Sequence, residues 1–270
     1  MQVVILCGGQ GTRLKEETQF RPKALVEIGD HPILWHILKG YGHYGFTDFI
    51  LCLGYKGDMI KQYFLNFERL HTNLRITLGP TPSVSVLSPE KPEPWSLTCV
   101  DTGADTPTGG RIHRIRPFIP ATDEIFMVTY GDGVSNVDIH ALLAFHKRHG
   151  RTATVTAVRP VSRFGTLQIE GELATGFVKG AHVESGWIDG GFFVFDRRIF
   201  DYLDDFSWLS GDVRDVKDGR GQATLQQLIG EQQLAVYQHQ GFWAAMDTQR
   251  DMETLTAIWK TGQAEWKVWV

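Results

Sequence analysis

The amino-acid sequence predicts an α/β fold, in which a Rossmann-like, mostly parallel sheet is flanked by helices and the C-terminal portion is less regular. Two observations predict it. Short apolar runs alternate with stretches whose apolar residues recur at helical spacing, and the connections between them are short. The length of 270 residues, 42% of them hydrophobic, suits one domain with a sizeable core. We therefore expect residues 1–270 to form a single domain.

The N-terminal half carries the clearest signals. Apolar runs bounded by polar residues predict strands, and apolar residues at helical spacing predict helices, with Pro32 suited to a first helical turn. In chain order we expect a strand at 3–7, a helix at 31–44, a strand at 48–54, a helix at about 58–67, a strand at 124–130 and a helix at about 137–149.

The rest of the chain is less regular. Five prolines between residues 79 and 96 indicate an excursion from the domain rather than a linker. The polar, glycine-containing segment 208–222 is predicted to be mobile. The remaining expected elements are strands at 152–158, 164–170 and 188–195, a helix near 224–233, a strand near 234–239 and a helix at 248–259.

Composition excludes several classes of function. A formal net charge of −4 and a pI near 6.2 argue against a nucleic-acid-binding or anionic-membrane surface. No stretch approaches the roughly 18 apolar residues of a membrane span, and no signal peptide precedes the first strand. Cys7, Cys52 and Cys99 are odd in number and lie among apolar neighbours, which favours core thiols in a reducing compartment. We expect a soluble, cytoplasmic protein.

A glycine-rich segment follows the first strand. Gly8, Gly9 and Gly11 lie at its carboxyl end, where parallel sheets bind ligands, and glycines let backbone N–H groups converge on phosphate oxygens. Arg13 can donate two hydrogen bonds to one phosphate, and Lys23 adds a mobile positive charge. The segment therefore predicts a polyphosphate site, and a turn with two surface cations is the alternative.

The spacing separates this loop from other phosphate loops. It lacks the Lys–Ser/Thr ending of a Walker A motif. Leu14 occupies the third glycine position of the dinucleotide-binding pattern, and the ribose-binding acid is missing. An NAD-dependent oxidoreductase is therefore a weak alternative.

Two aspartates are candidate metal ligands. Asp132 lies between glycines at the end of the strand 124–130, and a carboxylate there suits Mg²⁺, which prefers oxygen donors and substrate phosphates. Asp247 follows an apolar segment and could complete a cation site, or it could cap the next helix, a role for which Thr248 competes. Asp132 alone could equally be a turn residue.

The order of these elements resembles the sugar-1-phosphate nucleotidyltransferases, and within them the glucose-1-phosphate cytidylyltransferases. The resemblance extends over almost the whole chain, and its narrower motifs point to the cytidylyltransferase branch. The motifs are GGQGTRL with EET (16–18), RPKALVEIGDHPILWHI (21–37), GYKGDMIKQYF (54–64), DTG and TGGR (101–103 and 108–111), TYGDGV (129–134), DIHALLAFHKRHG (138–150), RFGTL (163–167), GGFFVF (190–195) and GFWAAMDT (241–248).

The resemblance implies a nucleotidyltransferase fold with a mixed, mostly parallel sheet, and Mg²⁺-dependent transfer of a nucleotidyl group, CMP from CTP, to glucose 1-phosphate. Residues 1–150 would mainly bind nucleotide and residues 151–270 mainly the acceptor. Arg13, Lys23 and Asp132 would be catalytic, and Asp132 and Asp247 would bind Mg²⁺. The implied nucleotide-binding residues are Leu6, Gly8, Gly9, Gly11, Thr12, Arg13, Lys23, Thr106, Thr108, Gly109, Arg111 and Gly131.

The acceptor half departs from the family pattern. The family's Glu-Lys-Pro is absent, and Lys179 stands near its place; Asp189 replaces an asparagine before Gly190. A carboxylate only accepts hydrogen bonds, whereas an amide also donates. We expect Gly165, Lys179, Asp189 and Gly190 to contact the acceptor. The departures keep open a different sugar or small polar phosphate as acceptor, or a catalytically silent nucleotide-binding relative.

The resemblance also implies a homo-oligomer. Trp259, Trp266 and Trp269 are predicted to pack on the domain or on a neighbouring subunit. His146 and His149 could share one helical face, and we expect them to be surface histidines rather than metal ligands.

Overall fold

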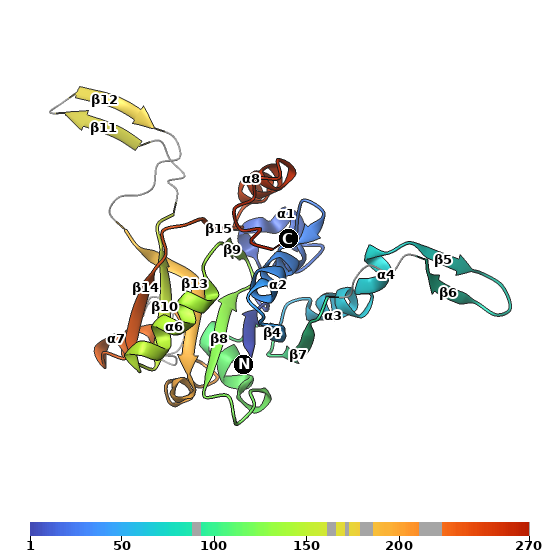
Figure 1. Cartoon of the computed structure of the whole chain (residues 1–270), viewed down its shortest axis with the longest axis horizontal. Helices are drawn as coiled ribbons and strands as arrows, with labels where there is room; N and C mark the ends of the chain where they lie inside the picture. Colours follow the sequence, from blue (N-terminus) through green and yellow to red (C-terminus); the bar gives the residue numbers. More distant parts are fainter. Residues whose placement is uncertain (88–92, 161–165, 171–172, 179–185, 211–222, 270) are drawn as a thin grey trace.

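The computed structural model describes residues 1–87, 93–160, 166–170, 173–178, 186–210 and 223–269. A seven-stranded sheet forms its centre, in the order β14-β10-β13-β8-β1-β4-β7 (Figure 1). The strands are β1 (Val3–Leu6), β4 (Asp48–Leu53), β7 (Ser96–Asp101), β8 (Ile125–Tyr130), β10 (Ala153–Val158), β13 (Ile188–Asp196) and β14 (Leu234–Gln238).

The sheet is mixed because of β13. This strand pairs antiparallel with both β8 and β10, whereas β8, β1, β4 and β7 run parallel to one another and β10 runs parallel to β14. The carboxyl ends of β8, β1, β4 and β7 therefore meet at one edge of the sheet, where ligands bind in folds of this kind.

Helices cover both faces of the sheet. The α-helices are α1 (Lys15–Thr18), α2 (Ile33–His43), α3 (Gly57–Leu65), α4 (Phe67–His71), α5 (Thr108–Arg114), α6 (Ile139–His149), α7 (Thr224–Gly230) and α8 (Gln249–Lys260). The 3₁₀ helices are η1 (Thr12–Leu14), η2 (Lys23–Leu25), η3 (Arg116–Phe118) and η4 (Arg197–Tyr202). Among the described residues, no helix is long and apolar enough to span a membrane.

Alternation along the strands divides the core into two layers. Side chains such as Val3 and Ile5 point to the face covered by α2, α3 and α6, while Val4 and Leu6 point to the face covered by α5, η4 and α7. Both layers are apolar, so the central strands are buried on both faces, as their apolar runs predict. Cys7 and Cys52 are buried free thiols, as expected, and Cys99 is half-buried.

Short strand pairs lie outside the main sheet. Two hairpins, β5 (Leu74–Thr77) with β6 (Ser83–Val86) and β11 (Thr166–Glu170) with β12 (Leu173–Val178), project from opposite ends of the molecule (Figure 1). β2 (Glu27–Ile28) pairs with β3 (His31–Pro32), and β9 (Gly133–Ser135) pairs with β15 (Trp243–Ala245).

Most expected elements are present, with boundaries shifted by a few residues. The strand expected at 3–7 is β1, the helix expected at 137–149 starts at Ile139 because Asp138 caps it, and the helix at 58–67 divides into α3 and α4. Pro32 lies just before α2 rather than in its first turn. The expected segment 208–222 lies outside the described residues from position 211 onward.

The tryptophans near the end of the chain pack on the domain, as expected. Trp266 and Trp269 are 1% and 9% exposed, and Trp266 Nε1 donates to Nδ1 of His36 on α2 at 3.4 Å. One expectation is wrong. His146 is buried rather than on the surface, and its Nδ1 lies 2.9 Å from Thr154 Oγ1. β10, which receives this side chain from α6, is buried along its whole length, and this contact is not visible in the helix's own spacing.

Candidate active site

The glycine segment after β1 bends tightly at the edge of the sheet. Gly11 has φ of +63°, a conformation that suits glycine, and its carbonyl oxygen accepts from Leu14 N to start η1. A Cβ on Gly8 would meet Arg111 Nη1 at 2.0 Å, whereas a Cβ on Gly9 would meet no described atom within 4 Å. Gly8 is therefore packed against the protein, and Gly9 presents its backbone to open space.

Arg111 fixes the loops around this segment. Its side chain is 4% exposed, and its guanidinium donates to the carbonyl oxygens of Gly8, Leu53, Gly103 and Ala104 and to Thr102 Oγ1. Burial lowers the pKa of Arg111 from its ordinary value. Arg111 also lines a cavity of about 890 Å³ at this edge of the sheet, but the hydrogen bonds of its guanidinium described above all serve the chain segments that shape that cavity.

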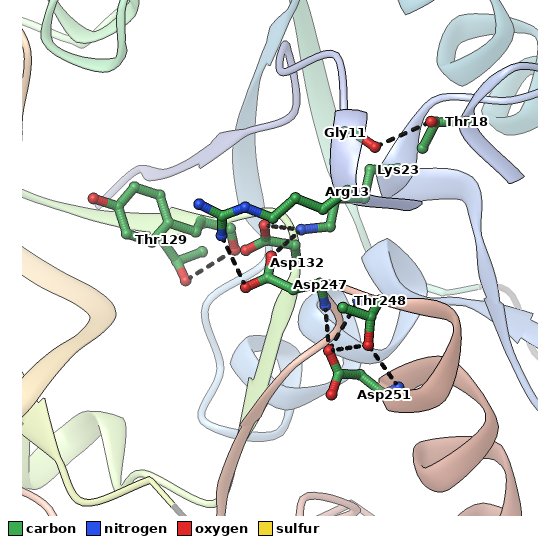
Figure 2. A network of polar contacts seen from close by, with 10 residues as sticks. Gly11, Arg13, Thr18, Lys23, Thr129, Asp132, Asp247, Thr248 and Asp251 are labelled. Atoms are coloured by element: carbon green, nitrogen blue, oxygen red, sulfur yellow. Dashed lines mark hydrogen bonds and ion pairs between the residues drawn. The ribbon is translucent and has the colours of Figure 1, made fainter. Parts of the chain in front are cut away.

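A cation lies between two carboxylates at the same edge. Lys23, at the start of η2, places Nζ 2.6 Å from Asp132 Oδ2 and 2.7 Å from Asp247 Oδ1, as Figure 2 shows. Burial would lower the pKa of Lys23, but attraction to Asp132 and hydrogen bonds to both carboxylates outweigh it, and the pKa is raised above its ordinary value. Lys23 is therefore a cation throughout the neutral range.

Backbone pairing brings the two aspartates together. Asp132 follows β8, and β9 directly after it pairs with β15, with Gly133 opposite Ala245. Met246 N then donates to Asp132 O at 2.9 Å, so Asp247 is set beside Asp132. The pairing of β9 with β15 thus brings Asp132 and Asp247 close together, as a cation site with two carboxylate ligands would require.

Thr248, not Asp247, caps α8. Its Oγ1 accepts from Asp251 N, and Asp251 Oδ2 accepts from Thr248 N and from Asp247 N, which completes a capping box. The capping role expected as an alternative for Asp247 therefore belongs to Thr248. Because Thr248 satisfies the helix terminus, the carboxylate of Asp247 is directed toward Lys23 (Figure 2).

Arg13 reaches the same cluster from outside. Its Nη1 lies 3.5 Å from Asp247 Oδ2, and its side chain is 78% exposed. An exposed pair of this length contributes little to stability. The guanidinium has the freedom to move onto a ligand's phosphate.

Two cavities meet at this cluster. The larger has a volume of about 890 Å³ and is lined by the glycine segment, Lys23, the loop 104–108 and the aromatic pair Phe206 and Trp208. The smaller has a volume of about 270 Å³ and is lined by Asp189, Gly190 and Asp247 among others. Tyr130 and Asp132 line both cavities. The charged cluster therefore stands at the boundary between them.

Other predicted nucleotide-binding residues lie around the larger cavity in different roles. Leu6, Gly131, Thr106 and Thr108 line it. Thr106 Oγ1 accepts from Arg114, and Thr108 Oγ1 accepts from Leu209 N. Gly109 packs against Ser207, where a Cβ would meet a carbonyl oxygen at 2.6 Å, and Thr12 begins η1 at the surface.

Similarity to known proteins identifies the family of this chain. Residues 2–262 match the family described as "Nucleotidyl transferase". The chain belongs to the nucleotidyl transferase family. A glucose-1-phosphate cytidylyltransferase of Salmonella typhimurium is 42% identical over 271 residues, and the match covers 100% of each chain. A Bacillus subtilis protein named "Probable glucose-1-phosphate cytidylyltransferase" is 43% identical over 272 residues, again with 100% of each chain covered.

A solved structure shares the fold of this nucleotidyl transferase. The structure of HddC from Yersinia pseudotuberculosis superposes with a TM-score of 0.63 at 21% identity, covering 96% of this chain and 99% of that one. The expected fold class, a mixed and mostly parallel sheet flanked by helices, is therefore confirmed.

In this nucleotidyl transferase the smaller cavity holds two of the four expected acceptor-binding residues. Asp189 Oδ1 accepts from Gly191 N at 2.8 Å, and its Oδ2 accepts from Tyr130 OH at 3.3 Å. Burial raises the pKa of Asp189, although these hydrogen bonds oppose the rise. Gly190 O accepts from Trp243 Nε1. Gly165 and Lys179 lie outside the described residues.

Sequence reasoning missed several residues that line the cavities of this nucleotidyl transferase. Tyr130 lies within the motif that contains Asp132, and Trp243 lies within the motif that contains Asp247, so an aromatic residue in each of these motifs was the available signal. Phe206 and Trp208 carry no such signal, because they lie just before and at the start of the irregular segment 208–222, for which no helix or strand was predicted.

Proposed function

We propose that this protein transfers a CMP group from CTP to glucose 1-phosphate, which yields CDP-glucose and pyrophosphate. The observation that carries the proposal is the position of Lys23, Asp132 and Asp247 at the boundary between two cavities. A nucleoside triphosphate in the larger cavity and a sugar phosphate in the smaller one would meet there. The relatives of highest identity named above bear this activity in their names.

The chemistry needs positive charge more than it needs a base. A phosphate oxygen of the acceptor forms a bond to the α-phosphorus, the bond to the bridging oxygen breaks, and pyrophosphate leaves with the electron pair. The attacking oxygen is already ionised at neutral pH, because the second pKa of a phosphate monoester is about 6. Lys23 and Arg13 would neutralise charge on the transferred group and on the leaving group.

Mg²⁺ fits the donor set. Magnesium is commonly bound by one or two carboxylates together with substrate phosphates and water, and Asp132 and Asp247 are close enough to share one ammonium. Within the described residues there is no group of three or more His, Cys, Asp or Glu that could hold a metal without substrate. The two aspartates would hold the ion, which supplies charge neutralisation at the phosphates.

The two cavities also suggest how the chain divides its work. Residues 1–150 supply most of the larger cavity and would bind nucleotide, and residues 151–270 supply Asp189, Gly190 and Asp247 to the smaller one. This division would concern ligand binding and not the sheet, because β13 and β10 belong to the same sheet as β8 and β1.

Pyrophosphate release tests the proposal directly. The purified protein is assayed with Mg²⁺ and glucose 1-phosphate against CTP, UTP, GTP, ATP and dTTP in turn. We expect release with CTP and at least tenfold less with the other nucleotides. Efficient release with another nucleotide would refute the assignment of CTP, and no release with any of them would refute transfer to glucose 1-phosphate.

Asp189 favours a second candidate acceptor. A half-buried carboxylate that lines the smaller cavity disfavours a second negative charge, so an acceptor with an amine or an additional hydroxyl facing Asp189 would suit this position. A panel of sugar phosphates with CTP separates the candidates, and exclusive use of glucose 1-phosphate would exclude the second one.

We also propose that the protein is a homo-oligomer in which the β5–β6 hairpin packs against a second copy. Leu74 faces Val86 and Ile76 faces Val84 across the hairpin, so one face is apolar, and Ile76 is 62% exposed. An isolated two-stranded hairpin is marginally stable in water, so a covering surface is expected. Light scattering should show a multimer that Ile76→Asp weakens and Thr77→Asp, on the polar face, does not. A monomeric wild-type protein would contradict this.

A further inference from the structure

We propose that Trp208 and Phe206 form an aromatic wall on which the nucleotide base stacks. The proposal rests on the proposed function and adds residues that determine how the nucleoside is held. Both side chains line the larger cavity, and they are 36% and 52% exposed. Single exposed apolar residues are common on protein surfaces, but two exposed aromatic side chains that line one cavity form an apolar surface suited to a ligand.

The segment that carries the wall is anchored on both sides of the cavity. On the α5 side, Gly110 N donates to Ser207 O at 2.9 Å and Leu209 N donates to Thr108 Oγ1 at 3.0 Å. On the β8 side, Ser210 Oγ lies 3.0 Å from Tyr130 OH. The segment therefore crosses the cavity as a fixed strip.

The turn that begins this strip is internally bonded. Asp204 Oδ1 accepts from Phe206 N at 2.9 Å and from Ser207 Oγ at 2.6 Å. Arg114 Nε on α5 donates to Asp205 Oδ1 at 2.7 Å. These contacts place Phe206 at the tip of a closed turn, so its ring needs little ordering when a base arrives, which favours binding.

Two glycines in α5 permit this close packing. A Cβ on Gly109 would meet Ser207 O at 2.6 Å, and a Cβ on Gly110 would meet Asp205 O at 2.4 Å. Glycine weakens the interior of a helix, so a pair of them there indicates a close approach by another backbone. Here that backbone is the segment that carries the two rings.

The order of the strand ends along the edge of the sheet indicates that the wall contacts the base rather than the phosphates. Asp132 follows β8, and the loop before α5 follows β7, with β1 and β4 between them. Three strand spacings separate these ends by about 14 Å. Phosphates held at Lys23 and Asp132 therefore direct the nucleoside toward the loop 104–108, where the aromatic strip is anchored.

Equilibrium binding without acceptor tests the wall. The probes are CTP and tripolyphosphate, which carries the charge but no base. We expect Trp208→Ala and Phe206→Ala each to weaken CTP binding by about tenfold, in the range found for base–aromatic stacking, and to leave tripolyphosphate binding unchanged. Trp208→Phe, which keeps a ring, should retain most of the affinity. Phe118→Ala is the matched control, because Phe118 is 48% exposed and does not line the cavity.

The outcomes separate this proposal from the proposed function. Equal weakening of CTP and tripolyphosphate, or unchanged CTP binding in both alanine variants, would overturn the wall. If the wild-type protein binds CTP but releases no pyrophosphate, the proposed function fails while the binding comparison still decides the wall. If Trp208→Ala and Phe206→Ala raise only the KM for the sugar phosphate, the two rings contact the acceptor instead of the base. That result would also overturn the wall.

Discussion

Lys23 Nζ lies 2.6 Å from Asp132 Oδ2, although the two residues are 109 positions apart in the sequence. The contact joins the segment after β1 to the end of β8, and Asp247 completes it from a third place in the chain. The ammonium balances part of the negative charge of two neighbouring carboxylates, which would otherwise repel each other. Charge balance at this point links the chain segment after β1 to the candidate metal ligands.

Removing either partner of this contact should abolish most activity. We expect Lys23→Ala and Asp132→Asn each to lower kcat by at least about a hundredfold, as loss of a charge-stabilising group does in other enzymes. The fold should persist, because neither side chain belongs to the apolar core. Pyrophosphate release and circular dichroism provide the measurements. Near-normal turnover in either folded variant would contradict the assigned roles.

Adjacent glycines should respond differently to alanine. Gly8→Ala forces a Cβ against Arg111 and should lower the free energy of unfolding by about 1–3 kcal/mol, as overpacking does. Gly9→Ala meets open space, so the free energy of unfolding should change little while the KM for CTP rises. Thermal unfolding and steady-state kinetics test the pair. An equally destabilised Gly9→Ala protein would show that the two glycines share one structural role.

The cap of α8 should affect activity through Asp247. Thr248→Ala removes the side-chain acceptor for Asp251 N and should lower the free energy of unfolding by about 1 kcal/mol. It should also lower kcat, because the capping box holds the backbone N–H of Asp247. Thr248→Ser keeps the hydroxyl and is the control. If Ser and Ala variants lose equal activity, the methyl group rather than the cap is responsible.

Two buried histidines should make the protein sensitive to acid. Burial lowers the pKa of His36 and of His146 to about 4. A histidine in the unfolded chain binds a proton near pH 6.5, whereas His36 and His146 in the folded protein bind one only near pH 4. Proton binding therefore favours the unfolded state between these two values. The free energy of unfolding is at its full value above pH 6.5 and decreases as the pH falls toward 4. The loss is about 3 kcal/mol for each residue.

Denaturation at several pH values between 7 and 4 measures this loss. The two histidines together supply part of the slope of unfolding free energy against pH, and His36→Gln should remove about half of that part. His140→Gln, at an exposed position on α6, should leave the slope unchanged. A slope in His36→Gln equal to that of the wild-type protein would exclude His36 as a source.

Replacing Asp189 with asparagine should favour an anionic acceptor. Asp189→Asn keeps an oxygen for Gly191 N and removes a negative charge from the smaller cavity, so the KM for glucose 1-phosphate should fall severalfold. The KM for CTP should not change, because Asp189 does not line the larger cavity. A higher KM for the acceptor would instead indicate that the carboxylate contacts a hydroxyl or amine of the substrate.

Local patterns predicted the parts of the site that lie at strand ends. Gly8 and Asp132 follow buried parallel strands, and the carboxyl ends of such strands share one edge, so their proximity followed from the sheet alone. The meeting of Asp132 with Asp247 did not follow. It depends on the pairing of two three-residue strands, β9 and β15, which are too short to give a periodic signal.

Arg111 illustrates a second limit of sequence reasoning. The resemblance places Arg111 among the nucleotide-binding residues, yet its guanidinium donates to carbonyl oxygens at three places in the chain: after β1, at the end of β4 and after β7. Carbonyl groups left unpaired by tight turns carry no signature in the sequence, because every residue has one. The same reasoning explains why the anchored strip at Trp208 went unpredicted.

The distance in sequence between Lys23 and Asp247 has a consequence for synthesis. The two residues are 224 positions apart, and the ribosome adds about 5–20 residues per second, so Lys23 leaves it roughly 10–45 s before its second partner. During that time the nascent chain contains the glycine segment, Lys23 and later Asp132, but not Asp247. A ribosome-bound chain therefore cannot complete the cluster of Lys23, Asp132 and Asp247 until synthesis has passed its last member.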